Sequence, residues 1–154
     1  MLMPEADAAR AQMEASQKEA QETYQTMVEE YQAKAQKFQQ NQATWTAAIK
    51  ESKQKELADI SNRIQEFDQS IQQELQQQQS QLMAPIQQKA IEAVNTLAKE
   101  GGYIYVFEES SLLYIDKAQS TDLTPAARKA LNIPDGRTLE TLSQELQAKA
   151  QMTE

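Results

Sequence analysis

Two narrow stripes of apolar residues constrain the fold of this chain more than any other feature of its sequence. Both advance mainly in alternating steps of three and four residues, which is typical of a coiled-coil seam rather than of a globular helix. The first stripe consists of Tyr24, Val28, Tyr31, Ala35, Phe38, Trp45 and Ile49, with the polar Gln42 at one position of the same spacing. The second consists of Leu57, Ile60, Ile64, Phe67, Ile71, Leu75, Leu82, Ile86, Ala90, Val94 and Leu97. The sequence therefore predicts two long helices.

The second stripe leaves the heptad spacing at a run of glutamines, residues 76–79. A slip of this kind changes the supercoil locally. A glutamine run also occurs in disordered, low-complexity segments. Apolar residues bracket this run on the same helical face, so we favour a continuous helix.

The helical pattern weakens between the two stripes, at residues 41–46. Thr44 or Thr46 is suited to cap a new helix, and Trp45 can pack over the first turn of that helix. We therefore expect the chain to reverse its direction here.

A reversal at this point aligns the two stripes along their length. Residues that face each other in an antiparallel pair have numbers with a constant sum, and that sum is 88 for Tyr31 with Leu57 and for Val28 with Ile60. We predict an antiparallel coiled-coil hairpin, or tentacle, over residues 4–84.

Pro85 lies inside the second helical pattern. A proline within a helix removes one backbone hydrogen bond and clashes with the carbonyl four residues earlier, here that of Gln81. One interpretation is a tolerated kink without a role. We favour a hinge between the hairpin and a C-terminal body.

The body is predicted over residues 85–133 and contains a β-hairpin at 103–115. Gly101 and Gly102 are suited to end the second helix, and we expect Gly101 in the left-handed cap position. The residues that follow are rich in β-branched and aromatic side chains, which favours two short strands. The side chains expected in an oligomeric sheet are Tyr103, Tyr105, Phe107, Leu113, Tyr114 and Ile115. An isolated hairpin that is apolar on both faces needs partners, so we expect the chain to oligomerise.

Two shorter helices complete the prediction. Thr124 at the N-cap and Pro125 at the first helical position predict a short helix over 125–131. The C-terminal extension, residues 134–154, begins with a turn and continues as an amphipathic helix. The fold class is thus mainly α with a small β part.

The composition excludes most kinds of chemistry. The 154 residues include no His, no Cys and only three Gly, which removes His and Cys metal sites, thiol nucleophiles and glycine-rich phosphate loops. The net charge of −8 disfavours binding to nucleic acid. No apolar stretch is long enough to insert stably into a membrane. We predict no catalytic, cofactor-binding or metal-binding residues, no cofactor and no enzymatic activity.

The segment after the predicted hairpin resembles a known family. Pro85-Ile86 with Lys89-Ala90-Ile91, followed by Gly101-Gly102-Tyr103 and a strand that contains Leu113-Tyr114, is similar to the Skp (OmpH-like) periplasmic chaperones. The resemblance covers about residues 1–133. It implies a homotrimer in which three helical tentacles extend from a β-barrel body. It further implies an ATP-independent holdase that encloses unfolded outer-membrane β-barrel proteins.

Two departures from the family pattern alter these expectations. The family has a strand before its first helix, and the pattern found here starts after it, so we expect this strand and a signal peptide to be missing from the chain. Familiar members are often basic, whereas this chain is acidic. Apolar and hydrogen-bonding contacts from Met, Tyr and Gln would then have to hold a client.

Two other functions stay open at this point. One is a structural or adaptor coiled coil that docks a specific folded partner. The other is a cytosolic chaperone like prefoldin, which shares the plan of tentacles on a β body. A signal peptide would separate the periplasmic from the cytosolic chaperone.

Overall fold

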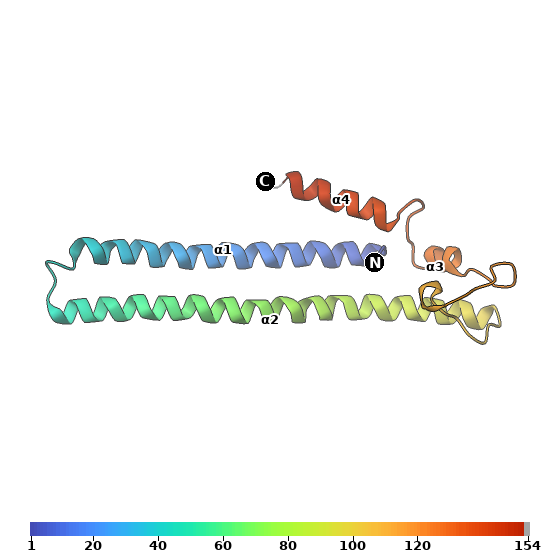
Figure 1. Ribbon diagram of the computed structural model, residues 1–154, viewed down its shortest axis with the longest axis horizontal. Coiled ribbons are helices and arrows are strands. Elements are labelled where there is room, and N and C mark those ends of the chain that lie inside the picture. The colour runs from blue at the N-terminus through green and yellow to red at the C-terminus, as the bar shows by residue number, and fades with distance from the viewer. Residues whose placement is uncertain (153–154) are drawn as a thin grey trace. The chain divides into compact units, whose positions relative to one another are not determined.

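A computed structural model describes residues 1–152 as a mainly helical chain (Figure 1). Its elements are α1 (Pro4–Asn41), α2 (Ala47–Glu100), the 3-10 helix η1 (Glu109–Ser111), α3 (Thr124–Ala130) and α4 (Leu139–Met152). The prediction of a mainly α fold is confirmed. Helix α4 lies within the extension predicted to be helical, of which residues 153–154 are outside the described part.

The predicted β-hairpin does not form in the single chain. Residues 103–115 contain η1 and otherwise irregular backbone, and no strand occurs anywhere in residues 1–152. Glu108 and Leu112, which flank η1, have the extended backbone of a strand, with φ of −72° and −96°. A two-stranded hairpin that packs against nothing is marginal in water, so a lone chain lacks the contacts that would fix one.

The chain divides into two compact units, which we describe separately. The terminal unit comprises Met1–Arg10 and Gln81–Glu154, and the hairpin unit comprises Ala11–Ser80. Both long helices contribute residues to both units. The unit boundary in α2 lies just before Pro85, the predicted hinge.

In the hairpin unit, α1 and α2 run side by side in opposite directions (Figure 1). The Lys34 ammonium pairs with the Glu56 carboxylate, and the Gln78 amide donates a hydrogen bond to the Ser16 hydroxyl at 2.9 Å. The residue numbers of these pairs add up to 90 and 94 rather than 88. Long side chains beside a seam reach diagonally. The pairing of the two helices therefore agrees with the predicted register to within about two helical turns.

The connection between the helices is short and capped at both ends. The Asn41 carbonyl accepts a hydrogen bond from the Thr44 backbone N–H at 3.0 Å, and the Thr44 hydroxyl donates to the same carbonyl at 2.9 Å. At the start of α2, the Thr46 hydroxyl accepts from the backbone N–H of Ile49. Thr46 is therefore the N-cap, and Thr44 closes the end of α1.

The core of the terminal unit is built on small side chains. Its buried residues are Met3 just before α1, Ala6 and Ala9 in the first turns of α1, Ile86 in α2 and Leu131 just after α3. Ala6 is only 1% exposed and Ala9 5%. Since an alanine buries little apolar area, these turns contribute few contacts of large side chains to the core.

The end of α2 has the hydrogen bonds of a Schellman motif. The Tyr103 N–H donates to the Ala98 carbonyl at 2.9 Å, and the Gly102 N–H donates to the Lys99 carbonyl at 3.2 Å. Gly102, and not Gly101 as predicted, has the left-handed backbone that this motif requires, with φ of +68°. The Tyr103 ring lies over Gly101, where a Cβ atom would overlap it.

The caps of the two short helices differ from the prediction in one respect. Leu123, not Thr124, occupies the N-cap of α3, and the carboxylate of Asp122 accepts the Thr124 backbone N–H at 2.8 Å. The Asp122 carboxylate thus takes the capping role that the sequence predicts for the Thr124 hydroxyl. At α4, the Thr138 and Thr141 hydroxyls each accept the other residue's backbone N–H, at 3.1 and 2.8 Å. This reciprocal arrangement is that of a capping box.

Candidate functional site

The most exposed apolar surface of the terminal unit lies just after α2. Of the six side chains predicted to form an oligomeric sheet, four are more than 60% exposed: Tyr105 76%, Phe107 63%, Leu113 108% and Tyr114 81%. Tyr103 is 38% exposed, and Ile115 is half-buried. The neighbouring Ile104, at 85%, adds to this surface, which we call the apolar segment, residues 103–115.

The structure brings part of the apolar segment together. The rings of Tyr105 and Phe107 stack with their centroids 6.0 Å apart and their planes at 28°. Residues two apart share a face of extended backbone, so this stack shows a local strand-like arrangement without a paired strand. Lys117 pairs with Glu109 at 2.7 Å, and the Glu109 carboxylate raises the pKa of the Lys117 ammonium. This ion pair ties η1 to the chain that follows the segment.

Pro85, the predicted hinge, lies inside α2 with its ring exposed. The helix continues through it from Ala47 to Glu100. The next residue, Ile86, is 6% exposed and belongs to the core of the terminal unit. The proline is thus placed at the point where α2 enters that core.

The hairpin unit exposes aromatic side chains along α1. Tyr24 is 42% exposed and Tyr31 36%, although both belong to the predicted seam. Ile60 on α2 is the best buried seam residue of this unit, at 4% exposed. A two-helix pair covers only part of each ring, which leaves aromatic surface accessible to another molecule.

A cluster of ion pairs lies between the two helices of the hairpin unit. The Glu56 carboxylate contacts the Lys34 ammonium on α1 and the Lys53 ammonium on α2, the latter at 2.8 Å. Hydrogen bonds from Lys34 and then Lys53 lower the pKa of Glu56 to about 2. Hydrogen bonding to Glu56 raises the pKa of Lys34 in turn. These charges pair with each other, so their simplest role is to join the helices.

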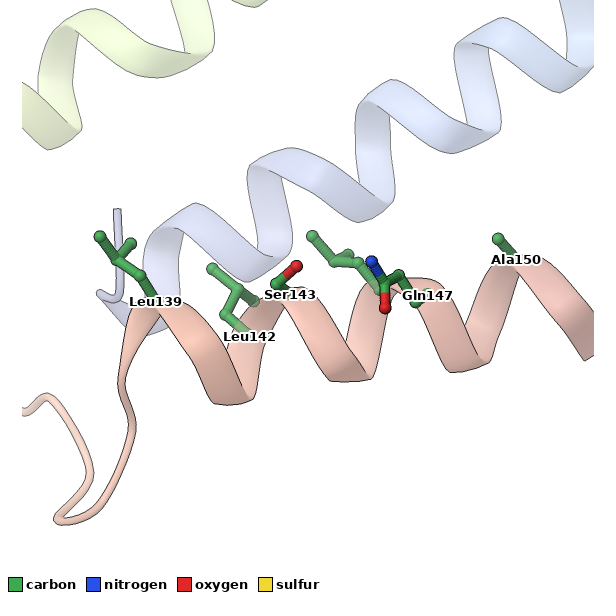
Figure 2. A pocket seen from close by; sticks show the side chains of 6 residues that line it. Leu139, Leu142, Ser143, Gln147 and Ala150 are labelled. Atoms are coloured by element: carbon green, nitrogen blue, oxygen red, sulfur yellow. The ribbon is translucent and has the colours of Figure 1, made fainter.

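A shallow hollow of about 370 Å³ runs along one face of α4 (Figure 2). All the residues that line it belong to this helix: Leu139, Leu142, Ser143, Leu146, Gln147 and Ala150. Leu142 is 8% exposed, whereas Leu139 is 70% exposed. The hollow offers apolar contact area but no convergent charged groups.

Within residues 1–152, no three acidic side chains gather closely enough to hold a metal ion. None of the described helices is both long and apolar enough to cross a bilayer. The exposed apolar surfaces described above are the apolar segment and the tyrosine-bearing face of α1.

Sequence reasoning missed one cluster of polar residues in the terminal unit. Asp7 on α1 pairs with Arg137, which immediately precedes the N-cap of α4, and with Arg10. The chain has only four arginines, at positions 10, 63, 128 and 137. An ion pair between residues so far apart in the sequence leaves no periodic pattern. The scarcity of arginine was therefore the one signal that could have pointed to Arg137.

Comparison with known proteins identifies one family. The family described as Outer membrane protein (OmpH-like) matches residues 1–131 of the chain. The match spans the two long helices, the apolar segment and α3, and it ends before α4. No curated protein matches the chain significantly.

Proposed function

Because this chain belongs to the OmpH-like outer membrane protein family, we propose that it is an ATP-independent holdase chaperone of the periplasm. In this role it binds unfolded outer-membrane β-barrel proteins and prevents them from aggregating. The resemblance found in the sequence and the family match agree on the family, which supports this proposal. The family is one of chaperones rather than enzymes.

The observation that supports the assembly on which this role depends is the exposure of the apolar segment. Ile104, Tyr105 and Leu113 are each more than 75% exposed in a single chain. Burying a large apolar side chain stabilises by about 1.5–3 kcal/mol, and exposed clusters of such residues mark interaction surfaces. We propose that three copies of the chain meet at this segment, where each supplies the strand contacts that a lone chain lacks.

The hairpin unit supplies the surface for the client. In the proposed assembly the helical hairpins enclose an unfolded chain, and Pro85 acts as the hinge of each tentacle. Half-exposed tyrosines and long glutamines offer many weak apolar and hydrogen-bonding contacts. Weak contacts of this kind hold a client without imposing a fold on it.

The acidic character of the chain argues against a mechanism in which positive charges on the chaperone attract the client. The net charge is −8, and the Lys34 and Lys53 ammonium groups already pair with Glu56. Salt strongly screens only charge–charge contacts, with a screening length of about 3 Å at 1 M. Client binding through apolar and amide contacts should therefore weaken less than twofold between 0.05 and 0.5 M salt. A loss of more than tenfold would show that charge dominates.

The direct test is an aggregation assay. A β-barrel outer-membrane protein unfolded in urea is diluted with or without this protein, and light scattering is followed. We expect one trimer per client to suppress scattering. Unchanged scattering at saturating chaperone would contradict the proposal. A tight, stoichiometric complex with one folded partner, without activity toward unfolded chains, would instead support the adaptor function.

Assembly is tested separately by the mass in solution. We expect a mass near three times 17.4 kDa by light scattering coupled to size exclusion. Leu113→Asp should reduce it to that of one chain. Leu139→Asp is the matched control, because Leu139 is also exposed, at 70%, but lies on α4. A trimer that survives Leu113→Asp would remove the apolar segment from the interface.

A further inference from the structure

We propose that residues 132–152 form a strap that fastens the first turns of α1 to the rest of the terminal unit. The strap is closed by Arg137. Its guanidinium Nη2 donates to the Oδ1 atom of Asp7 at 2.5 Å, across 130 positions of sequence. The Arg137 side chain is only 17% exposed, so this ion pair is partly withdrawn from water.

The strap is built to hold Arg137 in place. The guanidinium of Arg128, on α3, donates to the carbonyl of Arg137 at 2.7 Å and to that of Pro134 at 3.1 Å. The Thr138 capping box follows immediately and starts α4. One arginine therefore fixes the backbone of the other, whose side chain reaches α1. A planar guanidinium with several N–H donors is suited to bridging of this kind.

Apolar contacts support the strap on both sides of the ion pair. Leu131, before the strap, is 6% exposed and belongs to the core of the terminal unit. Ile133 packs against the same core, and Leu142 on α4 is 8% exposed. The strap is thus an integral part of this unit, although it lies beyond the residues matched by the family.

The first turns of α1 need such a fastening. They bury Met3 together with the two small residues Ala6 and Ala9, and Glu5 forms an ion pair with Lys89 on α2 that is largely exposed. Exposed ion pairs stabilise little. In the pair of Asp7 with Arg137 the arginine side chain is only 17% exposed, so this pair is better withdrawn from water.

Hydrogen exchange of the full-length chain tests the strap. The readout is the exchange rate of the backbone amides of residues 8–10, which lie within α1. In Arg137→Gln we expect these amides to exchange about tenfold faster, because a hydrogen bond to a charged group is lost. Lys129→Gln is the matched control, since it removes one positive charge from exposed α3 without touching Asp7. We expect less than a twofold change there.

Asp7→Asn supplies the second arm of the test. It should accelerate the same amides, and the double variant Asp7→Asn/Arg137→Gln should exchange no faster than the faster single variant. Additive effects of the two substitutions would show that they act independently and would overturn the strap. Equal rates in Arg137→Gln and in the wild-type chain would overturn it as well. If Arg137→Gln unfolds the terminal unit, Arg137→Lys, which keeps the charge but loses the planar fork, should give an intermediate rate.

Discussion

The ring of Phe38, near the end of α1, lies edge-on to the indole of Trp45 in the connection to α2. Their centroids are 5.7 Å apart and their planes are inclined at 69°. This pair bridges the point where the chain reverses, so it joins the last turns of α1 to the start of α2. Edge-to-face aromatic pairs stabilise by about 0.5–1.5 kcal/mol beyond the area that they bury.

Trp45→Ala should therefore loosen the reversal. Because Trp45 is half-buried, we expect the free energy of unfolding to fall by about 1–2 kcal/mol, below the cost of removing a fully buried Trp. Urea unfolding followed by circular dichroism measures this loss. Trp45→Phe keeps an aromatic ring and should recover most of it. A loss below about 0.3 kcal/mol in Trp45→Ala would show that the ring pair does not hold the turn.

Ile60 and Ile49 allow a matched comparison of burial within the hairpin unit. Ile60 is 4% exposed and Ile49 43%. Ile60→Ala should destabilise by about 2–4 kcal/mol, whereas Ile49→Ala should cost about 1 kcal/mol, because a cavity forms only at the buried position. Denaturant unfolding of both variants gives the difference. Equal costs would mean that the seam does not bury Ile60 in solution.

The ion cluster around Glu56 predicts a dependence of stability on acid pH. Hydrogen bonds from Lys34 and Lys53 lower its pKa to about 2. A carboxyl group with a lower pKa in the folded state stabilises above its ordinary pKa, and this contribution is lost as the pH falls through the folded value. The contribution of Glu56 should thus be present at pH 7 and decline between about pH 4.5 and 2.

Glu56→Gln should remove that part of the pH dependence. Melting temperatures measured at pH 7 and pH 2.5 should differ less in this variant than in the wild-type chain. Glu74→Gln, at an exposed site of the same helix, provides the comparison. Identical pH dependence in all three proteins would show that Glu56 is not paired in solution.

Pro85→Ala tests the proposed hinge. The substitution restores a backbone N–H inside α2 and removes a clash worth up to about 3 kcal/mol, so α2 should become stiffer. Spin labels at positions 74 and 92 lie about 27 Å apart on a straight helix. We expect a narrower distribution of this distance in Pro85→Ala than in the wild-type protein. Distributions of equal width would reject the hinge.

The helical part of the fold could be predicted because it depends on the spacing of apolar residues within each helix. Steps of three and four residues place Ile60 and Ile86 on buried faces, and both prove buried. The residues between the stripes lack this pattern, and α1 and α2 end and begin there. The resemblance to the OmpH-like family, based on the residues after the hairpin, is confirmed.

What the sequence could not predict depends on contacts between distant residues. The strands expected at 103–115 need neighbours that a single chain does not contain, so β propensity alone did not produce them. At α3 the N-cap is Leu123, and the Asp122 carboxylate accepts the Thr124 N–H, because two polar side chains two positions apart could serve the same role. The pairing of Asp7 with Arg137 has no counterpart in any local pattern.

The close approach of Tyr103 to Gly101 has a consequence for which residues position 101 can hold. A side chain at position 101 would overlap the tyrosine ring and would also lie 3.2 Å from the Leu97 carbonyl. Any bulkier residue would therefore have to displace the tyrosine ring from its place over the end of α2. The absence of a side chain at position 101 thus lets the first ring of the apolar segment pack back against the helix that precedes it.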